Sequence, residues 1–339
     1  MVGPGIGVIV LAGILGGSIL APIKVMRRWR FEKSWAVYSI WAYLIMPWAA
    51  ALATIPHLFS IYPEVSLRTM LICALCGLGW GIAVVLYGIA VNLIGLSLTT
   101  AILYGVSIAV GSLSPLLISR RDRLFSVQGL WIMLADAGII AGVLLCAWAG
   151  KVRDNHEKSN VAENPAKPFI QGRFVRGVAA ATLGAILSSL FNIALAYGGE
   201  FNRLAIARGA SPLYAANAQW AFTVTFGYIP NLLLTVMTFS RRRLWSNLPE
   251  GPASHWMWPP LMGVMFIAGT VLYGTGVGLM GSIGPVLGWP VYMSMSIIAG
   301  VFWGWATGEW TGAPRRVFNF LTIGILGQVL FIALLGILG

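Results

Sequence analysis

Apolar stretches of about 20 residues follow one another along this chain, each bounded by charge or by a turn rich in Pro, Asn or Gly. A helix of that length spans a bilayer, and in lipid only helices and closed barrels satisfy their own backbone hydrogen bonds. The sequence therefore predicts an all-α membrane protein with ten transmembrane helices. Their predicted bounds are 4–23, 35–55, 70–91, 97–118, 127–149, 174–197, 213–237, 257–278, 285–306 and 317–338.

The composition favours a protein whose surroundings are the lipid bilayer. The chain is 58% hydrophobic and 9% charged, whereas soluble proteins are about one quarter charged. The net charge of +12 does not predict a nucleic-acid partner, because the basic residues form short clusters between the apolar runs. Cys73, Cys76 and Cys146 lie inside predicted spans, so neither a disulfide framework nor a zinc site is expected. We expect no metal and no cofactor.

The distribution of Lys and Arg predicts the orientation. Counting Arg176 with the long linker, sixteen of these residues lie in connections after odd-numbered spans and six in connections after even-numbered spans. Because cytoplasmic loops are enriched in Lys and Arg, both termini are predicted to be periplasmic. Positive charge follows the span 4–23 and does not precede it, so this span is expected to be a retained helix and not a signal peptide.

One stretch of the sequence occurs twice, 186 residues apart. V85LYGIAVNLIG95 and V271LYGTGVGLMG281 are identical at seven of eleven positions, and Tyr87 corresponds to Tyr273. Such duplication is typical of transporters built from two related halves. Because each half has five spans, the second half is predicted to be inverted in the membrane. The predicted domains are residues 1–150 and 174–339, joined by a polar cytoplasmic linker at 151–173.

Several blocks of the sequence also resemble a known family. They are I19LAPIKVMRRWRFEKSW35 with M46PW48, L78GWGIAVVLYGIAVNLIGLSL98, G209ASPLYAANAQW220 and G308EWTGAPRR316. From about Ile19 to the end, the sequence resembles the L-rhamnose/proton symporter family of the drug/metabolite transporter superfamily. The resemblance implies that superfamily's ten-helix fold, a bacterial inner-membrane location and proton-coupled uptake of a sugar. The eighth span differs from that of the enterobacterial carriers, so the sugar can be rhamnose or a related deoxy sugar or hexose.

Sugars are bound by amide and hydroxyl side chains and by aromatic rings that lie against their C–H faces. The candidates for sugar binding are Trp80, Tyr87, Tyr104, Ser107, Asn192, Asn217, Gln219, Trp220, Tyr273, Trp289 and Tyr292. The three amides are expected to face the interior, because each needs a partner in lipid. Helix packing is the alternative interpretation of the aromatic residues, and interhelical hydrogen bonding that of the two asparagines.

Charged residues near the membrane suggest two further roles. Asp136 is the only acidic residue well inside a predicted span, which makes it the candidate for proton coupling, with a structural role as the alternative. Lys24 and Glu309 lie at helix ends and are expected to act in a gate or in loop ion pairs. The small-residue pairs Gly13/Gly17 and Gly77/Gly81 predict close helix packing. The segment Gly284–Pro290 predicts either a broken helix or a kink.

Two other functions remain open at this point. A metabolite exporter of the same superfamily would have the same fold, since the direction of transport depends on coupling. A non-transporting scaffold or lipid-modifying enzyme is the alternative from another class, and the duplicated halves without a catalytic motif argue against an enzyme. The sequence does not indicate the oligomeric state.

Overall fold

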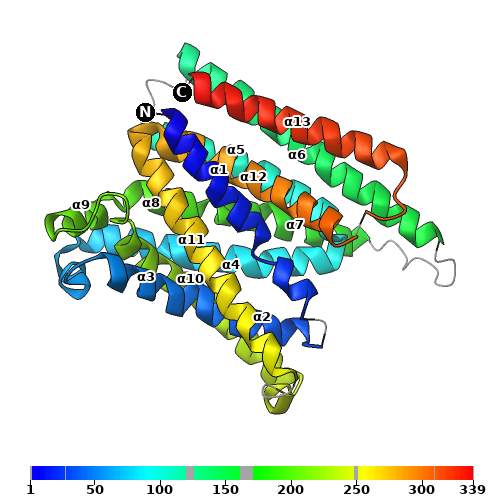
Figure 1. Ribbon diagram of the computed structural model, residues 1–339, viewed down its shortest axis with the longest axis horizontal. Coiled ribbons are helices and arrows are strands. Elements are labelled where there is room, and N and C mark those ends of the chain that lie inside the picture. Colours follow the sequence, from blue (N-terminus) through cyan, green and yellow to red (C-terminus); the bar gives the residue numbers. More distant parts are fainter. Residues whose placement is uncertain are drawn as a thin grey trace.

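The computed structural model describes residues 2–26, 28–119, 126–160, 171–247, 251–308 and 310–338, and within these ranges it contains helices and no strand. Figure 1 shows the helices gathered into one bundle, with the two termini close together. The α-helices are α1 (Val2–Ser18), α2 (Phe31–Ile40), α3 (Met46–Thr54), α4 (Leu67–Ile94), α5 (Leu96–Ser119), α6 (Val127–Asn160), α7 (Gln171–Ser188), α8 (Leu190–Tyr197), α9 (Gly199–Ala207), α10 (Asn217–Arg241), α11 (Trp258–Leu279), α12 (Gly284–Ala306) and α13 (Arg315–Leu338).

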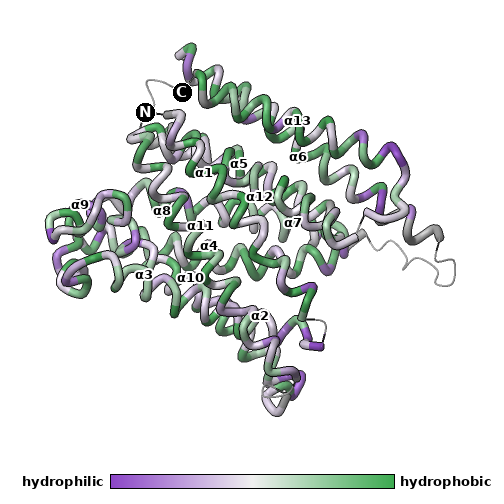
Figure 2. Tube along the Cα trace, viewed as in Figure 1, coloured by the Kyte–Doolittle hydropathy of each residue, from purple (hydrophilic) through white to green (hydrophobic). Residues whose placement is uncertain are grey.

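Most of the predicted spans coincide with helices long enough to cross a membrane. Within the described residues, nine helical segments have the required length and apolar composition. At the predicted fourth span, α5 contributes a shorter apolar segment, Leu98–Ser114. The membrane-spanning character is confirmed, whereas the number ten stays a prediction. Figure 2 shows hydrophobic residues along the helices and hydrophilic residues mainly at their ends and connections.

The second and sixth predicted spans are each made of several helical pieces. A π-helical turn, η2 (Trp41–Ile45), joins α2 to α3. The sixth span consists of α7 and α8, which meet at Ser189, and α9 follows directly after Gly198. In contrast, α12 is continuous through Pro290, so the broken-helix interpretation of this segment is wrong. Pro285 lies in the first turn, where no N–H is required, and Pro290 removes only one helical hydrogen bond.

The helices pack in a recognisable order. α1 lies against α11 and α12, and α4 lies against α7 and α10. α5 and α12 pack together near the middle, while α6 and α13 form a long pair at one edge of the bundle (Figure 1).

Glycines allow two of these helix pairs to approach closely, as predicted. A methyl group on Gly77 would lie 2.1 Å from the Thr223 carbonyl oxygen on α10. A methyl group on Gly17 would lie 2.1 Å from the Ser296 carbonyl oxygen on α12. Real Cβ atoms do not come that close to oxygen, so a larger residue would push the backbones apart.

Candidate functional site in the centre of the bundle

The buried amide of Asn192 joins four helices. Asn192 lies in the first turn of α8, just after the interruption at Ser189. Its Nδ2 donates to the carbonyl of Gly111 on α5 at 2.9 Å and to that of Pro285 on α12 at 2.8 Å. Its Oδ1 accepts from the hydroxyl of Tyr273 on α11. All the polar atoms of the side chain are therefore satisfied in the interior.

The local sequence explains why a helical carbonyl is free to accept from Asn192. In an α-helix the carbonyl of residue i accepts from the N–H of residue i+4. Pro115 follows Gly111 by four residues and has no N–H, so the Gly111 carbonyl lacks its usual helical donor. The Asn192 amide replaces that donor.

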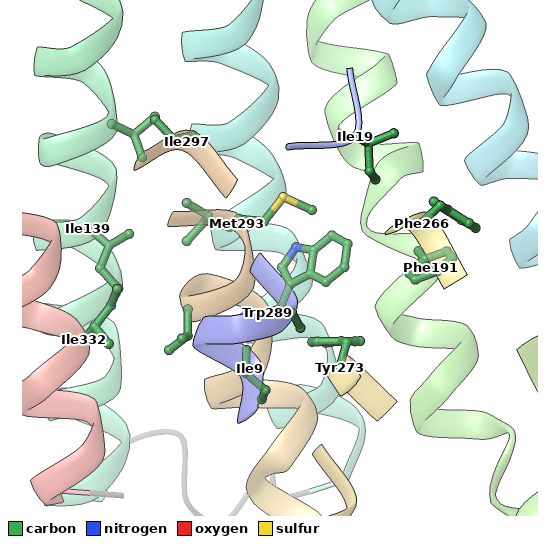
Figure 3. Close-up of a cluster of buried hydrophobic side chains, with 14 of the residues drawn as sticks. Ile9, Ile19, Ile139, Phe191, Phe266, Tyr273, Trp289, Met293, Ile297 and Ile332 are labelled. Atoms are coloured by element: carbon green, nitrogen blue, oxygen red, sulfur yellow. The ribbon is translucent and has the colours of Figure 1, made fainter. Parts of the chain in front are cut away.

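Trp289 lies beside this amide and closes the site from α12. Its indole Nε1 donates to the Ser107 carbonyl of α5 at 2.9 Å. The Trp289 ring meets Tyr273 edge-on at 6.0 Å between ring centroids, and it stacks on Tyr292 at 6.0 Å. Figure 3 shows Trp289 and Tyr273 next to one another in the core. Apolar ring faces and hydrogen-bonding groups thus meet in one place.

A series of aromatic rings continues from the site through the bundle. Phe191, next to Asn192 in sequence, stacks on Trp220 of α10 at 4.6 Å and lies 6.4 Å from Trp289. On its other side it contacts Trp80 of α4 at 5.1 Å. Trp80 in turn stacks on Phe266 of α11 at 6.1 Å.

A cavity of about 300 Å³ borders the site on one side. Its lining includes Leu195 on α8, Gly274 on α11 and Pro285 on α12, which are close in sequence to Asn192, Tyr273 and Trp289. The Pro285 carbonyl that accepts from Asn192 belongs to this lining residue. Pro285 therefore belongs both to the polar cluster and to the lining of the cavity.

Asp136 lies outside this cluster, on the face of α6 that is covered by α5. Its side chain is buried, and Ser112 of α5 is the polar group beside it. Among the described residues, neither of the Asp136 carboxyl oxygens has a hydrogen-bond partner, and neither does the Ser112 hydroxyl.

The chain is similar to known proteins over nearly its whole length. Residues 5–339 match the family described as L-rhamnose-proton symport protein. The chain belongs to this family. The L-rhamnose-proton symporter of Escherichia coli (strain K12 / DH10B) is 26% identical over 325 residues, which cover 94% of this chain and 92% of the relative. That of Shigella boydii serotype 18 is 25% identical over the same lengths.

The family is one of multi-pass membrane transporters and not of enzymes, and its members couple sugar movement to protons. The resemblance predicted from the sequence blocks is thus confirmed at the level of the family. Within the described residues, no group of three His, Cys, Asp or Glu side chains is placed to hold a metal ion.

The structure brings some predicted sugar-binding residues together and separates others. Asn192, Tyr273, Trp289 and Tyr292 form the cluster, Ser107 bonds to it, and Trp80 and Trp220 adjoin it through Phe191. Tyr104 is half-buried against the same core.

The remaining predicted sugar-binding residues face other partners. Gln219 donates to the Ala194 carbonyl of α8. Asn217 donates to Thr54 of α3 at 3.0 Å. Tyr87 is half-buried, with its hydroxyl 3.5 Å from Thr100.

The predicted gate residue Lys24 lies at a second cavity, of about 860 Å³, between α1, α11 and α12. Its ammonium group donates to the Thr307 hydroxyl at 2.8 Å. Trp303 lines the same cavity and donates to Ser18 at 2.7 Å. Glu309, the other predicted gate residue, lies outside the described residues.

Two polar groups in the core were missed from the sequence. Ser189 lies at the junction of α7 and α8, and its hydroxyl is 3.3 Å from that of Ser107. Gln328 of α13 accepts from Ser294 of α12 at 2.6 Å. A polar residue in the middle of an apolar window was the available signal for both.

Proposed function

We propose that this chain imports L-rhamnose or a related sugar together with a proton across a bacterial inner membrane. The observation that carries the proposal is membership, over residues 5–339, of the L-rhamnose-proton symport family. The matched relatives are bacterial proteins that carry the name L-rhamnose-proton symporter. An inner-membrane location follows from the multi-pass helices and from the bacterial origin of these relatives.

The sugar would bind at the Asn192 cluster. A sugar hydroxyl can both donate and accept a hydrogen bond. It can therefore replace the Tyr273 hydroxyl as the donor to the Asn192 oxygen, or replace one of the two carbonyls as the acceptor from the Asn192 nitrogen. The indole of Trp289 offers an apolar face to ring C–H groups and to the methyl group of a 6-deoxy sugar. The other predicted binding residues, Asn217, Gln219, Tyr87 and Tyr104, would have an indirect role or line the path.

The architecture we propose is that of the drug/metabolite transporter superfamily, with inverted repeats at residues 1–150 and 174–339 and a cytoplasmic linker at 151–173. Repeat-equivalent residues support it. Trp80 and Phe266 are 186 positions apart, as Tyr87 and Tyr273 are, and they stack on one another. Direct contact between equivalent positions is expected at a twofold axis.

Two glycines point to the same relation. Gly95 and Gly281 are also 186 positions apart, and both take a left-handed backbone, with φ of 84° and 64°. Glycine adopts a positive φ without strain, so both copies of the motif end at a position that favours glycine.

Helix packing also supports a twofold relation between the two halves. α4, the third predicted span, packs on α7 and α10, the sixth and seventh. Its equivalent α11, the eighth span, packs on α1 and on the second-span helices. The equivalent pairs α5 with α12 and α6 with α13 also contact each other, as a twofold relation requires.

Uptake into proteoliposomes with an imposed pH gradient, outside acid, tests the proposed function. A panel of radiolabelled 6-deoxy and ordinary hexoses should give accumulation of L-rhamnose or a close relative. Accumulation should disappear when a protonophore collapses the gradient. Failure of every sugar in the panel, under conditions in which the protein is folded, would contradict the proposed substrate class.

A further inference from the structure

We propose that Asp136 is the proton-carrying group of this transporter and that it acts on the sugar site through residues Gly111 and Ser112 of α5. The inference rests on the proposed symport of a sugar with a proton. It names the residue that carries the proton and the contacts that connect this residue to the sugar site, neither of which the family description gives.

Asp136 is an acid buried away from water. The Asp136 side chain is 4% exposed, and its two oxygens have no hydrogen bond among the described residues. A charge held in this way is costly, because no dipole or opposite charge replaces the lost water. The arrangement therefore suits a protonated carboxyl group.

The helices around Asp136 carry few charged side chains. The helices packed against α6 are chiefly α5, α12 and α13. α5 and α12 contain no Lys, Arg, Asp or Glu, and their titratable side chains are Tyr104 and Tyr292. The charges of α13 are Arg315 and Arg316 at its start.

The remaining titratable groups are on α6 itself. Cys146 lies 10 residues beyond Asp136 and accepts from Gln328 at 3.5 Å. Lys151 and Arg153 come at least 15 residues after Asp136, which is about four turns of helix. No cation among the described residues of these helices is thus positioned to neutralise a carboxylate at Asp136.

Asp136 is connected to the sugar site through α5. Ser112, beside Asp136, follows directly after Gly111, whose carbonyl accepts from Asn192 at 2.9 Å. Gly111 itself lies against Trp289, and a methyl group added to Gly111 would lie 2.2 Å from the Trp289 ring. A shift of α5 at Ser112 therefore moves a hydrogen-bond acceptor of the sugar site.

These contacts define a cycle that balances in protons. On the outside, the carboxylate takes a proton from hydronium, an O–H bond forms and water is left. The O–H can donate to the Ser112 hydroxyl, so α5 can close on α6 with Gly111 against Asn192. On the inside, the O–H bond breaks, water takes the proton as hydronium, and the charged carboxylate again requires solvent. One proton then crosses with each sugar.

Asp136→Asn tests the assignment, because the amide imitates the protonated acid and can also donate to Ser112. In proteoliposomes containing L-rhamnose, exchange with external labelled L-rhamnose should continue in this variant. Accumulation driven by an imposed pH gradient should fall to the equilibrium level, and L-rhamnose should no longer drive proton entry detected with an internal pH dye. Glu64→Gln, which removes an exposed acid, is the matched control and should accumulate sugar like the wild type.

A variant Asp136→Asn that still accumulates L-rhamnose would overturn the proposal. Ser112→Ala provides a second test if the first variant does not fold. It should lower accumulation while exchange continues, and unchanged accumulation would contradict the route through α5. If the wild type does not exchange L-rhamnose at all, the proposed substrate has failed, and this outcome is distinct from a failure of the coupling residue.

Discussion

At the scale of single residues, the amide of Asn192 makes hydrogen bonds to α5, α11 and α12 from a fourth helix, α8. One side chain thus connects segments from both predicted halves. Its bonds are all to neutral groups, which a sugar hydroxyl can imitate and exchange without leaving a buried charge. That property distinguishes this site from the ion pairs at the helix ends, such as Arg242 with Glu32.

Asn192→Ala should weaken L-rhamnose binding strongly. Removal of one partner from a buried hydrogen-bonded set costs roughly 1–3 kcal/mol, which is about one to two decades in affinity. Binding to the detergent-purified protein measures the change. Asn231→Ala is the control, since Asn231 is also a buried asparagine but bonds only within α10. Equal losses in the two variants would indicate general destabilisation and would contradict the assignment of Asn192 to the site.

The two equivalent tyrosines should differ in function. Tyr273→Phe removes the hydroxyl that donates to Asn192, whereas Tyr87→Phe removes one that lies near Thr100. We therefore expect L-rhamnose transport to fall by about tenfold in the first variant and to change little in the second. Initial rates of uptake at a low sugar concentration check this. A larger effect of Tyr87→Phe would place the site nearer to α4.

At the scale of helices, the eight-residue α8 is the element that positions the site. It begins after Ser189, which separates it from α7, and so its first turn can point an amide at α5 and α12. Elsewhere in the bundle, α4 and α10 pack in close contact. Gly77 and Gly81 face carbonyl oxygens of α10 at distances that leave no room for a side chain.

Gly77→Ala should therefore destabilise the protein by about 1–3 kcal/mol or more, because the added methyl group overlaps the Thr223 carbonyl. Gly88→Ala in the same helix is the control. An added methyl group there meets no atom within 4 Å, and alanine is the better helix former by roughly 0.5–1 kcal/mol. Thermal unfolding in detergent should show a lower midpoint for the first variant only. Equal stability of both would contradict the close packing of α4 and α10.

At the scale of the whole molecule, the helix ends at the termini and at the predicted linker bear on the topology, which stays a prediction. The two termini lie close together, and the end of α6 and the start of α7 lie toward the opposite end of the α6–α13 pair (Figure 1). An even number of spans with a cytoplasmic linker has this arrangement. If the halves are related by a twofold axis, as proposed, the Asn192 cluster lies between them, where a rocking motion can expose it to either side.

Cysteine labelling of intact cells should confirm this orientation. In a variant without the native cysteines, a cysteine at position 2 should react with an impermeant reagent, whereas one at position 160 should react only after the membrane is opened. The reason is the excess of Lys and Arg in connections after odd-numbered spans. The opposite pattern would reverse the topology.

The apolar length of the windows predicted the helices well, because a membrane leaves the backbone little alternative. The contact partners of individual side chains could not be predicted in the same way. Tyr87 and Tyr273 share one motif, yet one lies near Thr100 and the other meets Asn192, since their neighbours come from parts of the halves that differ. The interruption at Ser189 carries no proline or glycine, so the sequence showed a polar residue there but no helix-breaking residue.

Accumulation of L-rhamnose in proteoliposomes under an inside-alkaline pH gradient, compared between the wild type and Asn192→Ala, is the decisive test of proton-coupled sugar transport through the Asn192 site. The wild type should concentrate the sugar above the external level and should lose this accumulation on addition of a protonophore. Asn192→Ala should accumulate little at the same concentration. Proton-coupled transport through the Asn192 site would be contradicted by wild-type accumulation that does not depend on the pH gradient, or by an Asn192→Ala variant that accumulates as much sugar as the wild type.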